Sequence, residues 1–356
     1  MEIAPFELER WFDAYEHDAD IMLAESGIRS LEAGRFDTDP GELGYVIPTD
    51  GDPEFRAEIG KRYGHTTEEI CFTCGTQEAN YLVFRSLLDS ESHTVVITPT
   101  YQALSAVPGS ICDVSRVSLS SPDWDLDLDA VREAIHPETA LIVLNNPNNP
   151  TGKYHSKERV EELYNLAAEN DAYLLCDEVY RLLADDPLPP VASLGKWGIS
   201  TTSLTKAYGL AGLRFGWIAG SREVIEGAVR WKDYTTISPS LFGQHVARQA
   251  LGEHEDEILE ENRSLAREHH EIVEEWITEH DLSWHDPVGV NGFVIVPEEF
   301  SDGKSFCRAA VEEESVVLAP GEFFGFENYF RIGFGLPTAE LTEGLERVGR
   351  VIEQGE

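Results

Sequence analysis

The chain of 356 residues is 42% hydrophobic, which is enough for one large domain with its own core or for a large and a small one. Its 66 acidic and 27 basic residues give a formal net charge of −39, a surplus that would repel the phosphates of nucleic acids and the surfaces of anionic membranes. We therefore expect neither nucleic acid nor a membrane as a partner.

The acidic residues are spread through the whole chain, and lysine is scarce, with seven residues. This composition resembles the surface of a protein from a high-salt cytoplasm, where counterions screen repulsion over a Debye length of about 3 Å. Five cysteines, an odd number, do not form a disulfide framework and fit a reducing compartment. The N-terminus shows no signal peptide and no apolar run approaches the ~20 residues of a membrane helix, so we expect a soluble, cytoplasmic and halophilic protein.

The first elements along the chain are irregular. Residues 1 to about 40 are acidic with short helical pieces, and a loop rich in Gly, Pro and Asp over residues 45–60 runs into a short helix around 53–56. A short apolar strand then begins at Ile70 and ends at Gly75, and a helix over 77–88 repeats apolar residues at helical spacing. The free amides at the start of such a helix suit a phosphate, although most joints of this kind bind nothing.

Predicted strands and helices then alternate along the chain. Apolar strands are predicted at 94–98, 140–144, 172–176, 199–204 and 213–219, and a helix with Ser156 as N-cap lies between the second and third of these. Each strand ends in polar residues. The alternation predicts a mostly parallel sheet whose ligand site lies at the carboxyl ends of the strands.

The pattern changes after Ser240. A long helical segment carries apolar residues seven apart (Leu251, Ile258, Leu265 and Ile272), which indicates a stripe packed between two domains or, alternatively, a coiled coil. Strands at 292–297, 316–318 and 329–334 and helices at 304–313 and 341–352 then suggest a small α+β domain. We therefore predict a large α/β domain over residues 45–270, with residues 1–44 and 271–356 forming an N-terminal segment and the small domain.

Lys206 is the lysine most suited to chemistry. It lies in a polar loop broken by glycine, three residues after Ser203 and eight before Arg214. Burial and nearby positive charge would ease loss of its proton, so that it could attack a carbonyl carbon and form a Schiff base. Arg214 and Ser203 could supply that charge and anchor a phosphate. The alternative is an ordinary surface lysine after a strand.

Other candidates also lie at strand ends. Asp177 and Tyr180 follow a buried strand, where a carboxylate could pair with a ring nitrogen and a phenol could donate to a phenolate, or both could be turn residues. Asn149 is either a ligand or a turn residue beside proline, and Tyr101 either stacks on a planar ligand or fills the core edge. Arg331 lies among apolar residues, so an internal acid or a substrate carboxylate must meet its charge.

Cysteine spacing does not predict a metal site. Cys71 and Cys74 have the spacing of metal or redox pairs, but the chain has no second pair and these two lie in a predicted strand. We therefore expect no metal.

Taken in order, these motifs resemble the aspartate aminotransferase family, the class I and II aminotransferases that use pyridoxal 5'-phosphate. The resemblance is carried by Asn-Asn-Pro-Asn-Asn-Pro-Thr-Gly at 145–152, Asp177-x-x-Tyr180, Ser203-x-x-Lys206 with Arg214, and Arg331, and it covers about residue 45 to the C-terminus. It implies an α/β fold with a mostly parallel sheet of the seven-stranded type plus a smaller α+β domain. It also implies an enzyme that moves an amino group between an L-amino acid and a 2-oxo acid.

The resemblance assigns a role to each candidate residue. Lys206 would form the Schiff base and shuttle the proton, Asp177 would pair with the pyridinium nitrogen, and Tyr101 would stack on the ring. The phenolate oxygen would be held by Tyr180 and Asn149, the phosphate by Gly75, Thr76, Ser203 and Arg214, and the substrate by Arg331 and Asn149. Tyr45 matches a tyrosine that the partner subunit contributes to the phosphate site, which implies a homodimer with a shared active site.

Two departures leave specificity open. Cys74 stands where some relatives carry serine before the Gly-Thr pair. The first 40 residues do not align with the usual substrate-covering segment and resemble the start of a few family members acting on arginine-derived amino acids. A β- or γ-lyase or an amino-acid cyclase or deaminase would need the same cofactor residues, whereas a regulatory protein on this scaffold would need a basic DNA-binding segment that this acidic chain does not have.

Overall fold

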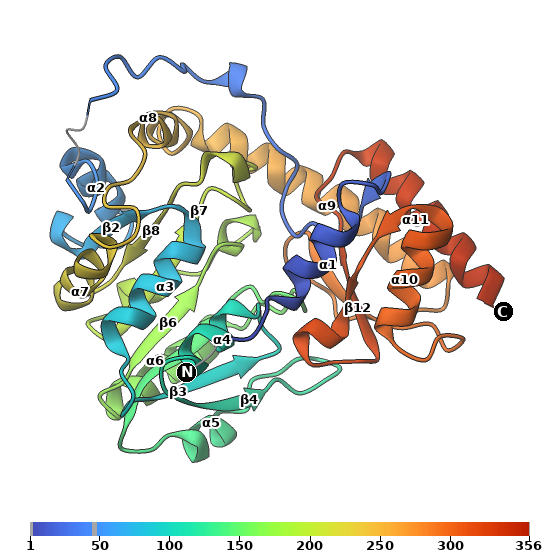
Figure 1. The fold of residues 1–356 in the computed structure, drawn as a ribbon, viewed down its shortest axis with the longest axis horizontal. Helices are drawn as coiled ribbons and strands as arrows, with labels where there is room; N and C mark the ends of the chain where they lie inside the picture. Colours follow the sequence, from blue (N-terminus) through green and yellow to red (C-terminus); the bar gives the residue numbers. More distant parts are fainter. Residues whose placement is uncertain (1–2, 45–47, 356) are drawn as a thin grey trace.

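The structure, a computed structural model, describes residues 3–44 and 48–355. Its main layer is a seven-stranded sheet in the order β2-β8-β7-β6-β5-β3-β4 (Figure 1). All neighbours pair in parallel except β8, which runs antiparallel to both β2 and β7. The strands are β2 (Ile70–Thr73), β3 (His93–Thr98), β4 (Asp113–Ser118), β5 (Thr139–Asn145), β6 (Tyr173–Asp177), β7 (Gly198–Ser203) and β8 (Gly216–Ala219). The mostly parallel sheet predicted from the sequence is thus confirmed.

Helices cover both faces of this sheet because its central strands are apolar on both sides. Leu141 and Val143 of β5 pack in one core with α3 and α7, whereas Ile142 and Leu144 pack in a second core with α6. The helices of this part are α2 (Pro53–Gly60), α3 (Gly75–Leu87), α4 (Ala103–Gly109), α5 (Leu128–Ala134), α6 (Lys157–Glu169) and α7 (Arg222–Lys232).

A smaller part with its own sheet lies beside the first (Figure 1). Its sheet is antiparallel, in the order β11-β12-β9, with β9 (Asn291–Ile295), β11 (Ala319–Pro320) and β12 (Tyr329–Gly333). It carries α10 (Gly303–Glu314) and α11 (Thr338–Gly355), and α9 (Glu255–Glu279) runs between the two parts. The predicted α+β character of this region is confirmed.

The N-terminal segment is docked on this smaller part. Strand β1 (Ile21–Met22) pairs in parallel with β10 (Val316–Val317). In α1 (Glu7–Tyr15), the indole Nε1 of Trp11 donates a 2.9 Å hydrogen bond to the carbonyl of Leu318. These contacts tie the N-terminal segment to the small part, and Glu9 of α1 also accepts a hydrogen bond from Tyr101 of the large part. Helix α1 therefore lies between the two parts (Figure 1).

Two expectations need correction. Strand β4 was not predicted, because its sequence Asp-Val-Ser-Arg-Val-Ser is polar at four of six positions and has no apolar run; it lies at the edge of the sheet. The single long helix expected after Ser240 is instead α8 (Leu241–Ala250) and α9, separated by a turn that contains Gly252. Leu251, Ile258 and Leu265 lie in the main core, so the apolar stripe is a packing surface and the coiled-coil alternative is wrong. None of the described helices is long and apolar enough to cross a membrane.

Candidate active site

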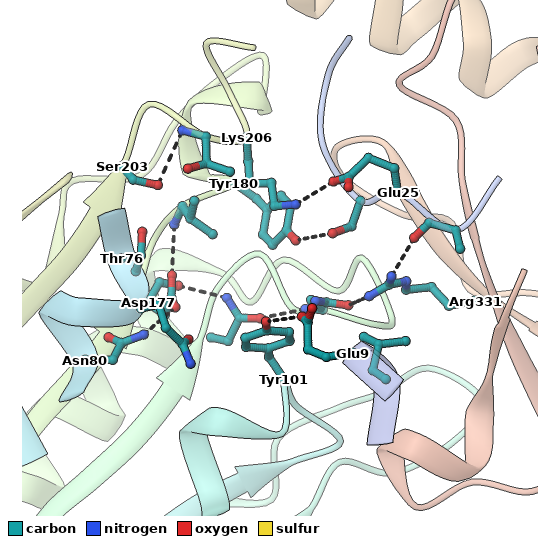
Figure 2. Close-up of a pocket in the computed structure, with 18 of the residues that line it drawn as sticks. Glu9, Glu25, Thr76, Asn80, Tyr101, Asp177, Tyr180, Ser203, Lys206 and Arg331 are labelled. Carbon is teal, nitrogen blue, oxygen red and sulfur yellow. Dashed lines mark hydrogen bonds and ion pairs between the residues drawn. The ribbon is translucent and has the colours of Figure 1, made fainter. Parts of the chain in front are cut away.

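A cavity of about 300 Å³ opens where β5, β6 and β7 end and α3 begins. The register of the parallel strands sets Asn145 of β5 beside Asp177 of β6, and Asp177 beside Thr201 of β7. Side chains that follow these strands therefore converge on one edge of the sheet, and β12 and α1 close the opposite side (Figure 2).

Lys206 reaches into this cavity and forms an ion pair with a residue that the sequence did not single out. Its Nζ lies 2.7 Å from Oε1 of Glu25, and its side chain is 19% exposed. Burial is the largest influence and opposes the charged amine, but the carboxylate of Glu25 and the phenol of Tyr180 together outweigh it, so that the pKa of Lys206 is raised. The charge of Lys206 in turn lowers the pKa of Glu25 to about 2. In this structure the amine is therefore held as an ammonium.

Asp177 is buried at the end of β6. Its Oδ2 accepts a 2.9 Å hydrogen bond from Nδ2 of Asn80, and its Oδ1 accepts one from the backbone N–H of Val179. Burial raises the pKa of Asp177 to about 6. No basic side chain of the described residues lies within 4 Å of this carboxylate. Asp177 is thus an anion above pH 6 without a cationic partner.

Asn80 is a residue that sequence reasoning missed. Its Oδ1 accepts a 2.6 Å hydrogen bond from the hydroxyl of Thr201, which fixes the orientation of the amide and turns Nδ2 toward Asp177. The sequence could have indicated that Asn80 faces the cavity, because it lies four residues after Thr76 and so shares one face of α3 with it.

Arg331 is 1% exposed in the middle of β12. Its guanidinium donates to Oδ1 of Asn149 at 2.8 Å and to the carbonyl of Ala24 at 2.6 Å, and its Nε has no partner. The sequence required an internal acid or a ligand here, and no described carboxylate lies within 4 Å of this guanidinium. Burial lowers the pKa of Arg331, so the site gains from an anion that enters the cavity.

A second anion site lies at the start of α3. The hydroxyl of Thr76 is buried and has no hydrogen-bond partner among the residues that the structure describes. Gly75 has a φ of +77°, and a Cβ at this position would lie 2.7 Å from the guanidinium of Arg214. Arg214 itself donates to the carbonyl of Ala211, and Oγ of Ser203 accepts a long 3.4 Å contact from the N–H of Thr205. Free donors, a helix N-terminus and a guanidinium together suit a phosphate.

Helix α1 forms a wall of the cavity that the sequence did not predict. Leu8, Glu9 and Phe12 line it, and Oε1 of Glu9 accepts a 3.1 Å hydrogen bond from the phenol of Tyr101. Burial, and then the charge of Glu9, raises the pKa of Tyr101. Further along the segment, the hydroxyl of Ser26 accepts a 2.9 Å hydrogen bond from the phenol of Tyr180.

Nine of the eleven residues predicted from the sequence line this cavity: Thr76, Tyr101, Asn149, Asp177, Tyr180, Ser203, Lys206, Arg214 and Arg331. Gly75 lies next to Arg214, and Tyr45 lies outside the described residues. The lining residues that were not predicted include Glu9, Glu16, Glu25, Ser26, Gln77, Asn80 and Thr205. The donor set fits pyridoxal phosphate, because it combines an amine, an unpaired buried carboxylate and an anion site with an orphaned hydroxyl.

Comparisons with known proteins agree with this arrangement. Residues 21–348 match the sequence profile of aminotransferase class I and II. A capreomycidine synthase from Streptomyces vinaceus is 30% identical over 96% of this chain and 92% of its own length. An aspartate/prephenate aminotransferase from Thermus thermophilus is 28% identical over 90% of this chain and 86% of its own length.

Solved structures give the same result at the level of the fold. A pyridoxal-phosphate-dependent aminotransferase from Streptococcus suis superposes with a TM-score of 0.94, at 32% identity, over 100% of this chain and 99% of the other. The pyridoxal-phosphate-dependent cyclase OrfR superposes with a TM-score of 0.90, at 26% identity, over 99% of this chain and 98% of the other.

Proposed function

This chain belongs to the class I and II aminotransferases and is a pyridoxal-phosphate-dependent aminotransferase, and from that premise we propose a role for each side chain around the cavity. The observation that carries the proposal is the meeting of three groups in one cavity: the amine of Lys206, the buried carboxylate of Asp177 and the unpaired guanidinium of Arg331. Each has a different task in moving an amino group from an L-amino acid to a 2-oxo acid.

When bound, pyridoxal phosphate supplies an aldehyde that takes up the amino group and a pyridinium ring that stabilises negative charge on the α-carbon. Lys206 would hold the cofactor through Nζ, and its amine would serve as the base that takes the α-proton of the amino acid. Asp177 keeps a proton on the ring nitrogen, since its carboxylate is ionised above pH 6 and has no other cation. Asn80 keeps that carboxylate in place.

Arg331 binds the α-carboxylate of the substrate. Oδ1 of Asn149 and the carbonyl of Ala24 orient its guanidinium while leaving its charge unpaired. Thr76, Ser203 and Arg214 bind the phosphate together with Gly75, whose missing side chain leaves room for Arg214. Tyr180 and Asn149 hold the ring oxygen, and Tyr101 stacks on the ring.

Replacement of Lys206 tests this assignment. Lys206→Ala is expected to remove both the visible absorbance of the bound cofactor and the turnover of amino acids, whereas Lys196→Ala, at a position outside the cavity, keeps both. Turnover that survives in Lys206→Ala would contradict the central role of this lysine.

We also propose a homodimer whose sites are completed by Tyr45 of the opposite subunit. Three large hydrophobic side chains near the start of α8 support an interface, because Tyr234 is 86%, Ile237 47% and Phe242 41% exposed in the single chain. In a mixture of Tyr45→Ala and Lys206→Ala subunits, hybrid dimers contain one intact site only if Tyr45 acts across the interface. A mixture that regains no activity would refute the shared site.

A second candidate function is a cyclase or lyase reaction in the same cavity, favoured by the similarity to capreomycidine synthase and to the cyclase OrfR. Amino transfer needs a 2-oxo acid acceptor for continued turnover and releases the donor's own 2-oxo acid. Sustained consumption of an amino acid without any acceptor would instead establish the second reaction.

The remaining proposals concern the cellular location of the enzyme, its adaptation to salt and its domain boundaries. We propose a cytoplasmic protein adapted to high salt, supported by its net charge of −39, and expect the unfolding temperature to rise from dilute to molar salt. The division into residues 45–270 and residues 1–44 with 271–356 also stays a proposal. Its second boundary falls inside α9, the helix that runs between the two parts.

A further inference from the structure

The wall that the N-terminal segment contributes to the cavity is acidic. Glu9 of α1, Glu16 just after it and Glu25 beyond β1 all line the cavity. The basic side chains that line it in the described chain are Lys206, Arg214 and Arg331. Each of these has a task on the cofactor or on the α-carboxylate, so no cation remains to neutralise the acidic wall.

Glu9 has capacity for a further donor. Its carboxylate accepts one hydrogen bond, from Tyr101 at 3.1 Å, and no basic side chain of residues 3–44 or 48–355 lies within 4 Å of it. An ionised carboxylate can accept about four hydrogen bonds. The contact with Tyr101 also fixes Glu9 beside the residue that we place on the ring.

Glu25 loses its partner when the cofactor is present. Its only basic contact within the described residues is Lys206, at 2.7 Å. Lys206 would hold the cofactor through the same Nζ that pairs with Glu25, so that the loaded enzyme awaiting its substrate would offer Glu25 no free ammonium. Arg331 still acts on both carboxylates at longer range, but a substrate α-carboxylate takes up its charge, so that Glu9 and Glu25 then face the cavity without a cation of the described residues to balance them.

The opposite pole of the substrate is fixed at Arg331. This side chain is 1% exposed, and its Nε has no hydrogen-bond partner in residues 3–44 and 48–355. Figure 2 places Glu9 and Glu25 on the same side of the cavity as Arg331, away from Asp177 and Thr76. An amino acid held by its α-carboxylate at Arg331 would thus extend its side chain among acids, where a second carboxylate is repelled and a cation is attracted.

We propose that the amino donor of this enzyme carries a cationic side chain, a guanidinium or an ammonium, which Glu9 and Glu25 bind. The inference rests on the proposed function of the cavity. It adds Glu9 and Glu25 as the residues that determine which amino acid is used.

The net charge of −39 is a competing explanation, because it attracts any cation to the protein. Helix α1 offers a matched control. Glu7 lies on the same helix, is exposed and does not line the cavity, so that Glu7→Gln and Glu9→Gln change the net charge equally. Only the second removes a carboxylate from the proposed binding site.

The test uses the loaded enzyme and follows the visible absorbance of its cofactor in a single half-reaction with excess amino acid and no 2-oxo acid. L-arginine is compared with L-citrulline, its neutral isostere, and L-lysine with L-norleucine. Glu9→Gln, Glu25→Gln and Glu7→Gln are measured in parallel. A charge-assisted contact predicts that the cationic member of each pair reacts with a 10- to 100-fold higher kcat/KM, roughly, in the unmodified enzyme and in Glu7→Gln.

In Glu9→Gln the ratio of kcat/KM for the cationic donor to kcat/KM for its neutral counterpart is expected to fall about tenfold or more, through a higher KM for the cationic donor. An unmodified enzyme that uses each pair equally, or a Glu9→Gln change no larger than that of Glu7→Gln, overturns the inference while leaving amino transfer intact. The comparison in the unmodified enzyme keeps the inference testable even where a variant does not fold. Failure of every amino acid to change the absorbance would instead refute the proposed function, and the inference with it.

Discussion

The ion pair between Glu25 and Lys206 predicts that the cofactor-free protein binds pyridoxal phosphate more slowly than it would without the carboxylate of Glu25. Only the neutral amine of Lys206 can attack the aldehyde, and Glu25 at 2.7 Å favours the ammonium. Glu25→Gln removes this carboxylate and leaves burial to lower the pKa of Lys206, because burial is the largest influence on this lysine. Uptake at neutral pH should therefore become faster in the variant.

The size of this effect follows from the exposure of the pair. The Glu25 side chain is 59% exposed, so solvent screens the interaction and about 1 kcal/mol is the appropriate magnitude, rather than the several kcal/mol of a buried pair. One pKa unit corresponds to about 1.4 kcal/mol, so the neutral fraction of Lys206 below its pKa should rise about fivefold.

The assay mixes cofactor-free protein with pyridoxal phosphate between pH 6 and 9 and follows the growth of the visible absorbance. The rate for the unmodified protein should rise with pH as the ammonium loses its proton, and the curve of Glu25→Gln should lie at lower pH. Glu7→Gln is the control for net charge. A Glu25→Gln rate equal to or below that of the control would refute the reasoning.

Three further substitutions test the cavity. Thr76→Val removes a buried hydroxyl that has no partner, so the cofactor-free protein should keep its stability while the dissociation constant for pyridoxal phosphate rises about tenfold, measured by equilibrium titration. Asp177→Asn should raise the stability of the cofactor-free protein at pH 8 by about 1.5 kcal/mol. Burial of the ion costs about 3 kcal/mol given a shift from 3.8 to about 6, and one lost hydrogen bond offsets about half; below pH 4, where the cost of the ion is gone, denaturant titrations should show a loss of about 1.5 kcal/mol instead, and turnover should fall. Arg331→Lys loses the paired geometry of the guanidinium, so KM should rise about tenfold or more for every amino acid with unchanged cofactor absorbance, and an unchanged KM would contradict its role.

Much of the cofactor side of the cavity was predictable because it follows from strand ends. In a parallel sheet the residues after each strand meet at one edge, so a sequence that places Asp177, Ser203 and Lys206 after apolar runs already brings them together. Arg331 was predictable for a different reason, since a charge among apolar residues must meet a partner. The expected internal acid does not lie within 4 Å among the described residues, and the guanidinium donates instead to Asn149 and to a backbone carbonyl.

The N-terminal wall was not predictable from the sequence. The contact between Glu25 and Lys206 joins residues 181 positions apart, and the one between Glu9 and Tyr101 joins residues 92 apart. Neither strand periodicity nor helix amphipathicity indicates such pairs. Nothing in the sequence around Glu25 indicated that it would pair with Lys206 or that Ser26 would accept a hydrogen bond from Tyr180.

The docking of the N-terminal segment on the small part means that cofactor binding and the choice of amino donor are assigned to different stretches of the sequence. Residues that we assign to the cofactor of their own subunit lie between positions 75 and 214, whereas Glu9, Phe12 and Glu25 lie on one continuous stretch. That stretch is fastened by β1 and by the indole of Trp11, which do not touch the cavity. A different N-terminal segment that kept these two contacts could therefore change the preferred amino donor without changing the reaction. Substrate specificity could diverge in this way by replacement of one continuous segment.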